Sequence, residues 1–191
     1  MDKITSLKRL INVLKQSDAK NYVSVAKNME IPASDFKKFT HWKEDGYARN
    51  CVFKNDKFEL ILICWKGKDF TPVHCHNNQK CWVYMVSGEM VEVRFKQNED
   101  GTLTETKHLD ITSGNLTYMD DSMGFHLLKN TSEKKAMTLH LYIKPVDKCA
   151  VFNAEKDNLE TSQKNFDRSD DLYKQGQITS IEFRQAQLNL R

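Results

Sequence analysis

The sequence contains neither a long apolar run nor a set of paired cysteines. No stretch reaches the ~18 apolar residues that a transmembrane helix requires, and residues 1–5 lack the apolar stretch and cleavage site of a signal peptide. The five cysteines are odd in number and form no Cys-x-x-Cys pair, which argues against a disulfide scaffold. These absences predict a protein of the reducing cytoplasm without a membrane partner.

Glycine-rich phosphate loops and nucleophile elbows are also missing from the chain. Lysines and acidic residues are interspersed and the net charge is only +3, so no nucleic-acid partner is expected. A length of 191 residues is enough for one good-sized core, or for one domain with an appendage. We expect a monomer.

The first part of the chain, residues 1–46, is predicted to form helices that pack on a sheet. Apolar residues recur there at helical spacing: Ile4, Leu7, Ile11 and Leu14. Residues 23–29 are expected to form a second short helix that ends before Pro32. Ser34 is the expected N-cap of a third helix.

Residues 47–153 change to short strands separated by polar turns. The expected strands are residues 58–65, 82–86, 90–95, 102–106, 116–119, 125–128 and 137–143. Ser87-Gly88 and the segment 98–101 supply turn signals. Many short strands at this spacing predict a mainly β fold, either a sandwich or a small barrel.

Residues 154–191 are polar and are predicted to form a C-terminal helical hairpin. The pattern comprises a seven-residue apolar repeat, a glycine stop and a capping box: Leu159, Phe166 and Tyr173, then Gly176, then residues 179–182. Through its stretch 171–189, the segment 155–191 resembles a fragment of a TolC-like outer-membrane efflux protein. The tail is therefore either foreign to the rest of the chain or an ordinary amphipathic hairpin.

Three histidines indicate a metal site. His74 and His76 are spaced as on a strand, so their side chains point to the same side of a sheet. His126, about fifty residues further on, can complete a three-nitrogen site inside a β-barrel. A single histidine is more often a hydrogen-bonded core or surface residue, and this is our interpretation of His41 and His108.

Several ordered motifs resemble a known family. The segment from His74 through Cys81 to Gly88 resembles the first cupin motif, with cysteine where most cupins have a glutamate ligand. A looser match to the second cupin motif runs over residues 114–130. Over about residues 1–153 the chain is similar to the type I cysteine dioxygenase family of the cupin superfamily. The further motifs that carry this similarity are residues 47–50, 62–65, 138–142 and 147–152.

The resemblance implies a cupin barrel, also called a jelly roll, over residues 47–153. Its implied metal is Fe(II), with His74, His76 and His126 as ligands. The implied enzyme is a thiol dioxygenase that adds both atoms of O2 to the sulfur of L-cysteine, giving cysteine sulfinic acid. Arg49 would pair with the substrate carboxylate through its planar fork, and Tyr47 would lie near that pair.

The resemblance also implies roles for the Tyr142 phenol and the Cys81 thiol. Thr138, His140 and Tyr142 are spaced so that one strand face carries all three, which permits a hydrogen-bond relay from hydroxyl to imidazole to phenol. Cys81 would stand beside this relay. In the family, a cysteine at this position can form a thioether with the tyrosine that corresponds to Tyr142.

Three other functions remain open from the sequence. A close variant would act on 3-mercaptopropionate, although Arg49 together with Cys81 favours cysteine. A non-catalytic metal-binding cupin, used as a small-molecule sensor, would not need the Arg49 and relay residues. An interaction protein organised by the helical tail is the third alternative.

Overall fold

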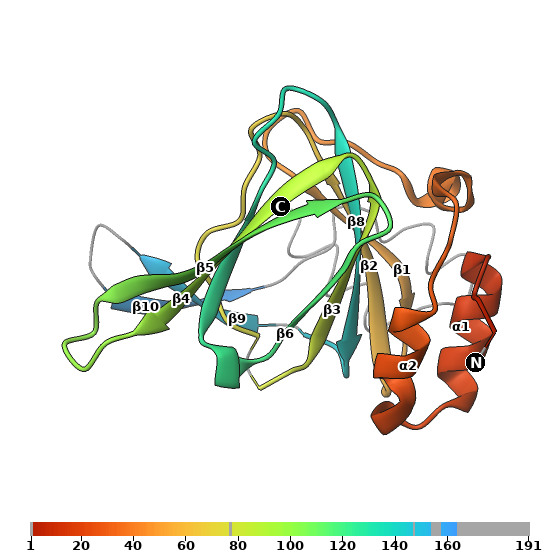
Figure 1. The fold of residues 1–191 in the computed structure, drawn as a ribbon, viewed down its shortest axis with the longest axis horizontal. Helices are drawn as coiled ribbons and strands as arrows, with labels where there is room; N and C mark the ends of the chain where they lie inside the picture. The colour runs from red at the N-terminus through yellow and green to blue at the C-terminus, as the bar shows by residue number, and fades with distance from the viewer. Residues whose placement is uncertain (1, 77, 147, 154–157, 164–191) are drawn as a thin grey trace.

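Two layers of antiparallel strands lie next to a pair of N-terminal helices (Figure 1). The computed structural model describes residues 2–76, 78–146, 148–153 and 158–163. The helical elements are α1 (Leu7–Gln16), η1 (Ala19–Asn21), α2 (Tyr22–Lys27), η2 (Ala33–Phe39) and η3 (Asp121–Met123). The strands are β1 (Ala48–Lys54), β2 (Phe58–Trp65), β3 (Cys81–Ser87), β4 (Glu89–Gln97), β5 (Leu103–Thr112), β6 (Leu116–Met119), β7 (Phe125–Lys129), β8 (Ala136–Ile143), β9 (Lys148–Asn153) and β10 (Asn158–Gln163). The prediction of a mainly β fold with N-terminal helices is confirmed.

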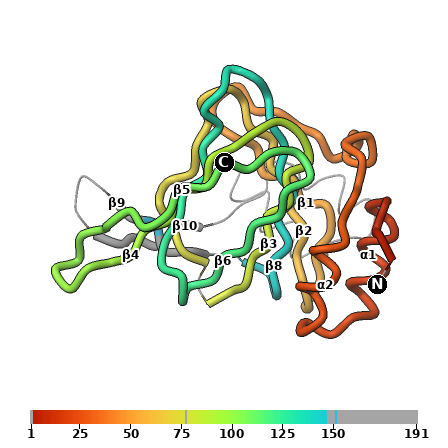
Figure 2. Tube along the Cα trace, viewed as in Figure 1, coloured from red at the N-terminus to blue at the C-terminus, as the bar shows by residue number. Residues whose placement is uncertain are grey.

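The strands form one sheet of order β1-β2-β8-β3-β6, a second of order β5-β4-β7, and the pair β10-β9. All these pairings are antiparallel. His74 forms isolated bridges to both His126 in β7 and Val151 in β9, so it joins the second sheet to the β9–β10 pair. Figure 2 shows β4, β5, β9 and β10 on the side of the molecule opposite to α1 and α2.

The core has two parts, and strand β2 contributes to both. Leu60 and Leu62 belong to the cluster that includes the buried residues of α1 and α2. Ile61 and Ile63 point the other way, into a cluster enclosed by both sheets. Because β2 is buried on both faces, its sequence is an almost continuous apolar run instead of an alternating one.

Helix α1 buries Leu7 and Leu14 as predicted and Leu10 beside them, whereas the predicted Ile11 is only partly buried. Its N-cap is Ser6, whose hydroxyl accepts a hydrogen bond from the Arg9 N–H at 3.2 Å. Ile4 lies before the helix and pairs with Met29 in a parallel bridge, so its burial comes from that pairing.

The other helical predictions are met in part. Helix α2 covers most of the predicted segment 23–29 and ends at Lys27. The prediction of Ser34 as an N-cap is wrong, because the 3-10 helix η2 begins at Ala33, follows Pro32 and has no side-chain cap. The fixed φ of proline suits the residue that precedes a helical turn.

The C-terminal helical prediction is wrong where the structure describes the tail. Residues 158–163 form strand β10, which pairs with β9 from Asn158↔Asn153 to Gln163↔Lys148. The ladder supplies backbone hydrogen bonds that a local helix would otherwise have to make. The predicted hairpin over residues 164–191, with its TolC-like stretch, lies outside the described residues. Among the described residues, no helix has the length and apolar character needed to cross a membrane.

Candidate metal centre

The three predicted histidines lie together at one place in the fold. His74 and His126 exchange backbone hydrogen bonds of 2.9 Å in both directions, which aligns a loop residue with strand β7. The nitrogen atoms that His74, His76 and His126 can offer all lie within 4.8 Å of one another. Their side chains are 5%, 2% and 1% exposed, so the cluster is shielded from bulk water.

Two of the rings are oriented by acceptors on their Nδ1 atoms. His74 Nδ1 lies 2.9 Å from the Pro72 carbonyl oxygen, and His126 Nδ1 lies 3.0 Å from Glu92 Oε1. A carbonyl or carboxylate oxygen only accepts hydrogen bonds, so Nδ1 carries the proton in each ring. The neutral ring then has its lone pair on Nε2, and this is how proteins prepare histidines as metal ligands.

The spacing of the nitrogens suits a shared cation. His76 Nε2 and His126 Nε2 are 3.0 Å apart, and their rings meet edge to face. Two nitrogens that each lie ~2.1 Å from one ion, at a right angle, are separated by about 3.0 Å. The donor set therefore fits a divalent first-row metal that accepts imidazole.

Glu92 on β4 is an acidic member of this site that the sequence analysis missed. Its carboxylate is fully buried. Burial alone would raise its pKa, but hydrogen bonds from His126, Thr117 and Arg94 lower it to about 2. Glu92 is therefore a carboxylate anion next to one of the three histidines.

The predicted relay is present on strand β8. Thr138, His140 and Tyr142 all point into the barrel and are at most 4% exposed. Thr138 Oγ1 lies 2.9 Å from His140 Nε2, and His140 Nδ1 lies 3.5 Å from the Tyr142 hydroxyl. The Tyr142 ring in turn meets the His76 ring edge to face at 5.5 Å, which connects the relay to the histidine cluster.

Trp65 determines the direction of this relay. Its indole N–H can only donate, and it donates to Thr138 Oγ1 at 2.8 Å. With one lone pair of Thr138 Oγ1 occupied, the hydroxyl proton of Thr138 can point at His140 Nε2, and in this arrangement the neutral His140 ring carries its proton on Nδ1. That proton faces the Tyr142 oxygen, so the Tyr142 O–H acts as a donor directed away from His140, with the Cys81 sulfur as its neighbour.

Cys81 and Tyr142 are direct partners across strands β3 and β8. Burial raises the pKa of the Cys81 thiol well above its usual range, and its hydrogen bond with Tyr142 only partly offsets this. Burial and the neighbouring Cys81 likewise raise the pKa of Tyr142 well above its ordinary value. Both groups are therefore neutral at physiological pH, with the sulfur and the phenol side by side.

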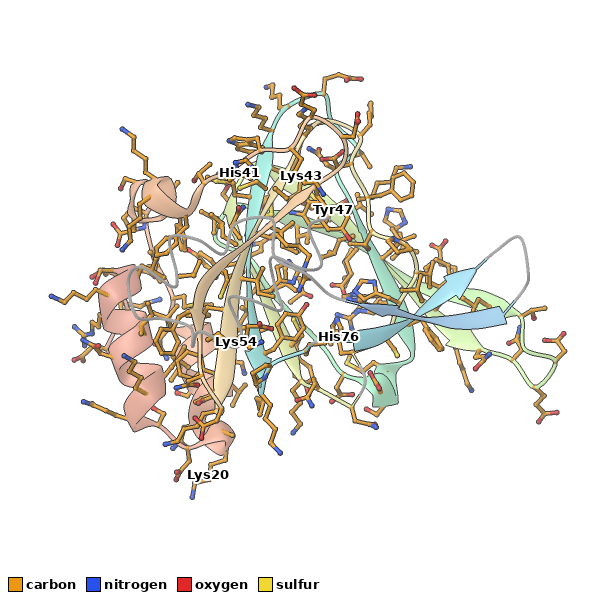
Figure 3. All side chains as sticks on the ribbon, turned by 180° about the vertical axis from the view of Figure 1, so that it is seen from behind. Lys20, His41, Lys43, Tyr47, Lys54 and His76 are labelled. Atoms are coloured by element: carbon orange, nitrogen blue, oxygen red, sulfur yellow. The ribbon has the colours of Figure 1, made fainter. Side chains whose placement is uncertain are left out.

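Arg49 and Tyr47 lie at the same barrel interior. Arg49, on β1, is only 9% exposed, and its charge lowers the pKa values of both Cys81 and Tyr142. The Tyr47 ring packs on Trp65 with ring centroids 4.8 Å apart. Figure 3 shows Tyr47 and His76 on the barrel, away from the N-terminal helices. The structure thus brings every predicted site residue into one region.

The two remaining described histidines lie apart from this region. His108 is exposed on β5, where its Nδ1 lies 3.6 Å from Glu105. His41 contributes its backbone carbonyl, which accepts a hydrogen bond from the Asn50 side chain. Their interpretation as residues outside the metal site agrees with these positions.

A barrel of antiparallel strands with three converging buried histidines defines the class of metal-binding cupins. Within this class, the sequence model described as "Cysteine dioxygenase type I" matches residues 2–155, and the chain belongs to that family. It is 30% identical to human cysteine dioxygenase type 1 over 163 residues, which covers 78% of each chain. The cysteine dioxygenase type 1 of Danio rerio is 27% identical over 172 residues, 85% of each chain.

A solved structure with a similar fold is an RmlC-like cupin protein from Desulfovibrio desulfuricans. Its TM-score is 0.43 at 15% sequence identity, and the match covers 55% of this chain and 88% of that one.

Proposed function

We propose that the protein is a cysteine dioxygenase that uses Fe(II) held by His74, His76 and His126. The reaction is R–SH + O2 → R–SO2H, in which both oxygen atoms join the sulfur of L-cysteine. The observation that carries this proposal is the contact of the three-histidine cluster with the Tyr142 relay, in a chain of this family.

The donor set supports iron as the resident metal. Three neutral imidazoles leave further coordination positions open, and imidazole is a good ligand for iron among the first-row metals. When bound, Fe(II) would supply the redox chemistry that lets triplet dioxygen react with a thiolate. Because the thiolate itself is anionic, the site does not need a carboxylate ligand at the position of Cys81.

Arg49 is the proposed partner of the substrate carboxylate. A guanidinium presents parallel N–H donors that match the two oxygens of a carboxylate. Its burial at the barrel interior means that such a pair forms in a low-dielectric setting, where it is stronger than in water. Tyr47 packs beside this region on Trp65 and helps to shape it.

Tyr142 is the proposed proton-holding group of the site. Its raised pKa keeps the phenol protonated, and the Trp65–Thr138–His140 chain orients it. The phenol can then donate a hydrogen bond to oxygen that is being transferred to sulfur. This role needs neither a metal–phenol contact nor a change in the charge of Tyr142.

The adjacent Cys81 and Tyr142 side chains are proposed to form a thioether. The new C–S bond replaces the S–H and one ring C–H, so two hydrogen atoms are lost and dioxygen is the oxidant. The cross-linked protein is therefore two hydrogen atoms lighter than the reduced chain, which intact-protein mass spectrometry resolves. A Cys81→Ser variant supplies the matched protein without the bond.

The deciding experiment is anaerobic loading with Fe(II) followed by oxygen-uptake and sulfinate assays with L-cysteine and with 3-mercaptopropionate. We expect sulfinate from cysteine, loss of iron and activity in His74→Ala, and neither loss in His108→Ala, where the histidine is exposed. Sulfinate from 3-mercaptopropionate alone would move the assignment to the related thiol dioxygenase. An iron-replete protein that forms sulfinate from neither thiol would refute the dioxygenase proposal and leave the metal-binding cupin as the alternative.

A further inference from the structure

Glu92 is a charged side chain in a place where charge is costly. Along β4, Met90, Glu92 and Arg94 share one face, and all three are at most 8% exposed inside the barrel. Removing an ion from water costs several kcal/mol, so a buried carboxylate needs strong compensation. The compensation observed here involves one of the histidines of the metal centre.

The Glu92 carboxylate accepts four hydrogen bonds, two on each oxygen. Oε1 accepts from Arg94 Nε at 3.1 Å and from His126 Nδ1 at 3.0 Å. Oε2 accepts from Thr117 Oγ1 at 2.5 Å and from Arg94 Nη2 at 3.3 Å. Neutralising the carboxylate requires only the arginine, so the bond to His126 is additional to the ion pair.

The surroundings hold this carboxylate in one orientation. Arg94 is the direct cross-strand partner of His126, so the ion pair lies next to the histidine by strand register. Arg94 Nη2 also donates to the Tyr118 carbonyl oxygen at 2.8 Å, which anchors the guanidinium to strand β6. The Glu92 carboxylate is therefore fixed from two strands, and its Oε1 presents a rigid acceptor to His126.

We propose that Glu92 is a positioning residue of the metal centre, which holds His126 as the Nδ1–H tautomer with Nε2 facing His76. This inference rests on the metal-binding part of the proposed function and does not depend on the substrate. A carboxylate partner also makes the imidazole a more basic ligand, and loss of such a partner usually weakens metal binding ~10–100-fold.

The first test measures metal affinity without substrate. Metal-free wild type, Glu92→Gln and Glu89→Gln are titrated with Co(II), and the dissociation constant is read from the visible absorption of the complex. Glu89 lies on the same strand but is exposed, so its variant is the control for loss of one negative charge. We expect binding ~10–100-fold weaker in Glu92→Gln and unchanged binding in Glu89→Gln. Equal constants in all three folded proteins would overturn the inference.

The second test remains decisive if Glu92→Gln does not fold. Long-range 1H–15N NMR of the metal-free wild type at pH 8 reports which nitrogen of each neutral histidine carries the proton, with His126 assigned by comparison with His126→Ala. Protonated Nδ1 on His126 supports the proposal, and protonated Nε2 overturns it. Neither measurement uses cysteine, so an iron-loaded wild type that makes no sulfinate would refute the dioxygenase assignment and leave this inference standing.

Discussion

Replacing Thr138 by valine tests the relay most directly. The substitution keeps the branched shape but removes the hydroxyl that accepts from Trp65 at 2.8 Å and lies 2.9 Å from His140. Thr138 and Trp65 are both fully buried, so water cannot replace the lost partner. A buried polar group that loses its partner costs ~1–3 kcal/mol. With two groups affected, we expect the free energy of unfolding to fall by about 2–6 kcal/mol.

Thermal unfolding followed by circular dichroism measures this cost. For a chain of this size, the expected loss corresponds to a melting temperature lower by roughly 4–24 °C. Thr138→Ser is the matched control, since it keeps the hydroxyl and loses one methyl group, at a cost of about 1 kcal/mol. Apolar burial alone predicts the opposite order, because valine buries more apolar surface than serine. A valine variant at least as stable as the serine variant would refute the reasoning.

The same pair of variants reports on activity. Without the Thr138 hydroxyl, the tautomer of His140 is no longer selected, and the Tyr142 phenol loses its fixed orientation. We expect sulfinate formation at saturating cysteine to fall ~10–100-fold in Thr138→Val and much less in Thr138→Ser. Equal turnover in both variants would show that the relay does not orient Tyr142.

Three further predictions concern the substrate, a buried thiol and a tight turn. Arg49→Ala should raise the KM for cysteine about 10–150-fold, the equivalent of ~1.5–3 kcal/mol for a charge-assisted bond, and unchanged cysteine kinetics would contradict its assignment. Burial raises the pKa of Cys64 from 9.0 to about 11, so the folded state favours the neutral thiol. The free energy of unfolding should therefore fall by up to about 3 kcal/mol as pH rises from 9 to 11. Urea unfolding at pH 8 and 10.5 should show a larger loss of stability in wild type than in Cys64→Ala, and equal losses in the two proteins would contradict this. Gly124→Ala should lower the melting temperature far more than Gly101→Ala. Both glycines have φ near +90°, but only a Cβ at Gly124 would clash with the Phe95 carbonyl oxygen. Equal shifts in melting temperature would mean that the turn at Gly124 relaxes without cost.

Local patterns along the chain predicted most of the strands, whereas the three-histidine cluster also required His126, about fifty residues further on. The relay on β8 follows from side-chain alternation, and His74 and His76 were recognisable from their spacing. The helical periodicity of α1 also corresponds to its buried face. In each case the signal lies within a few consecutive residues, where backbone geometry determines which side chains share a face.

The features that the sequence analysis missed depend on partners that are distant in the chain. The alternation around Glu92 is compatible with a solvent-exposed polar face, and only its contact with Thr117 on the opposite sheet shows that this face is interior. Strand β10 was predicted as helix because Leu159 matches a seven-residue repeat, whereas its pairing with β9 determines its conformation. The role of Trp65 required knowing that Thr138 lies within hydrogen-bond reach, 73 residues away in sequence.

The position of strand β8 in its sheet has a consequence for how the centre acquires metal. β8 has a hydrogen-bonded neighbour along both edges, β2 and β3, so its residues are released only when the barrel itself unfolds. His74, in contrast, is attached through isolated bridges outside the named strands. Local opening of that segment would expose the histidines while the relay stays in place. We therefore expect a chelator to remove bound metal under conditions in which the amide hydrogens of β8 do not exchange.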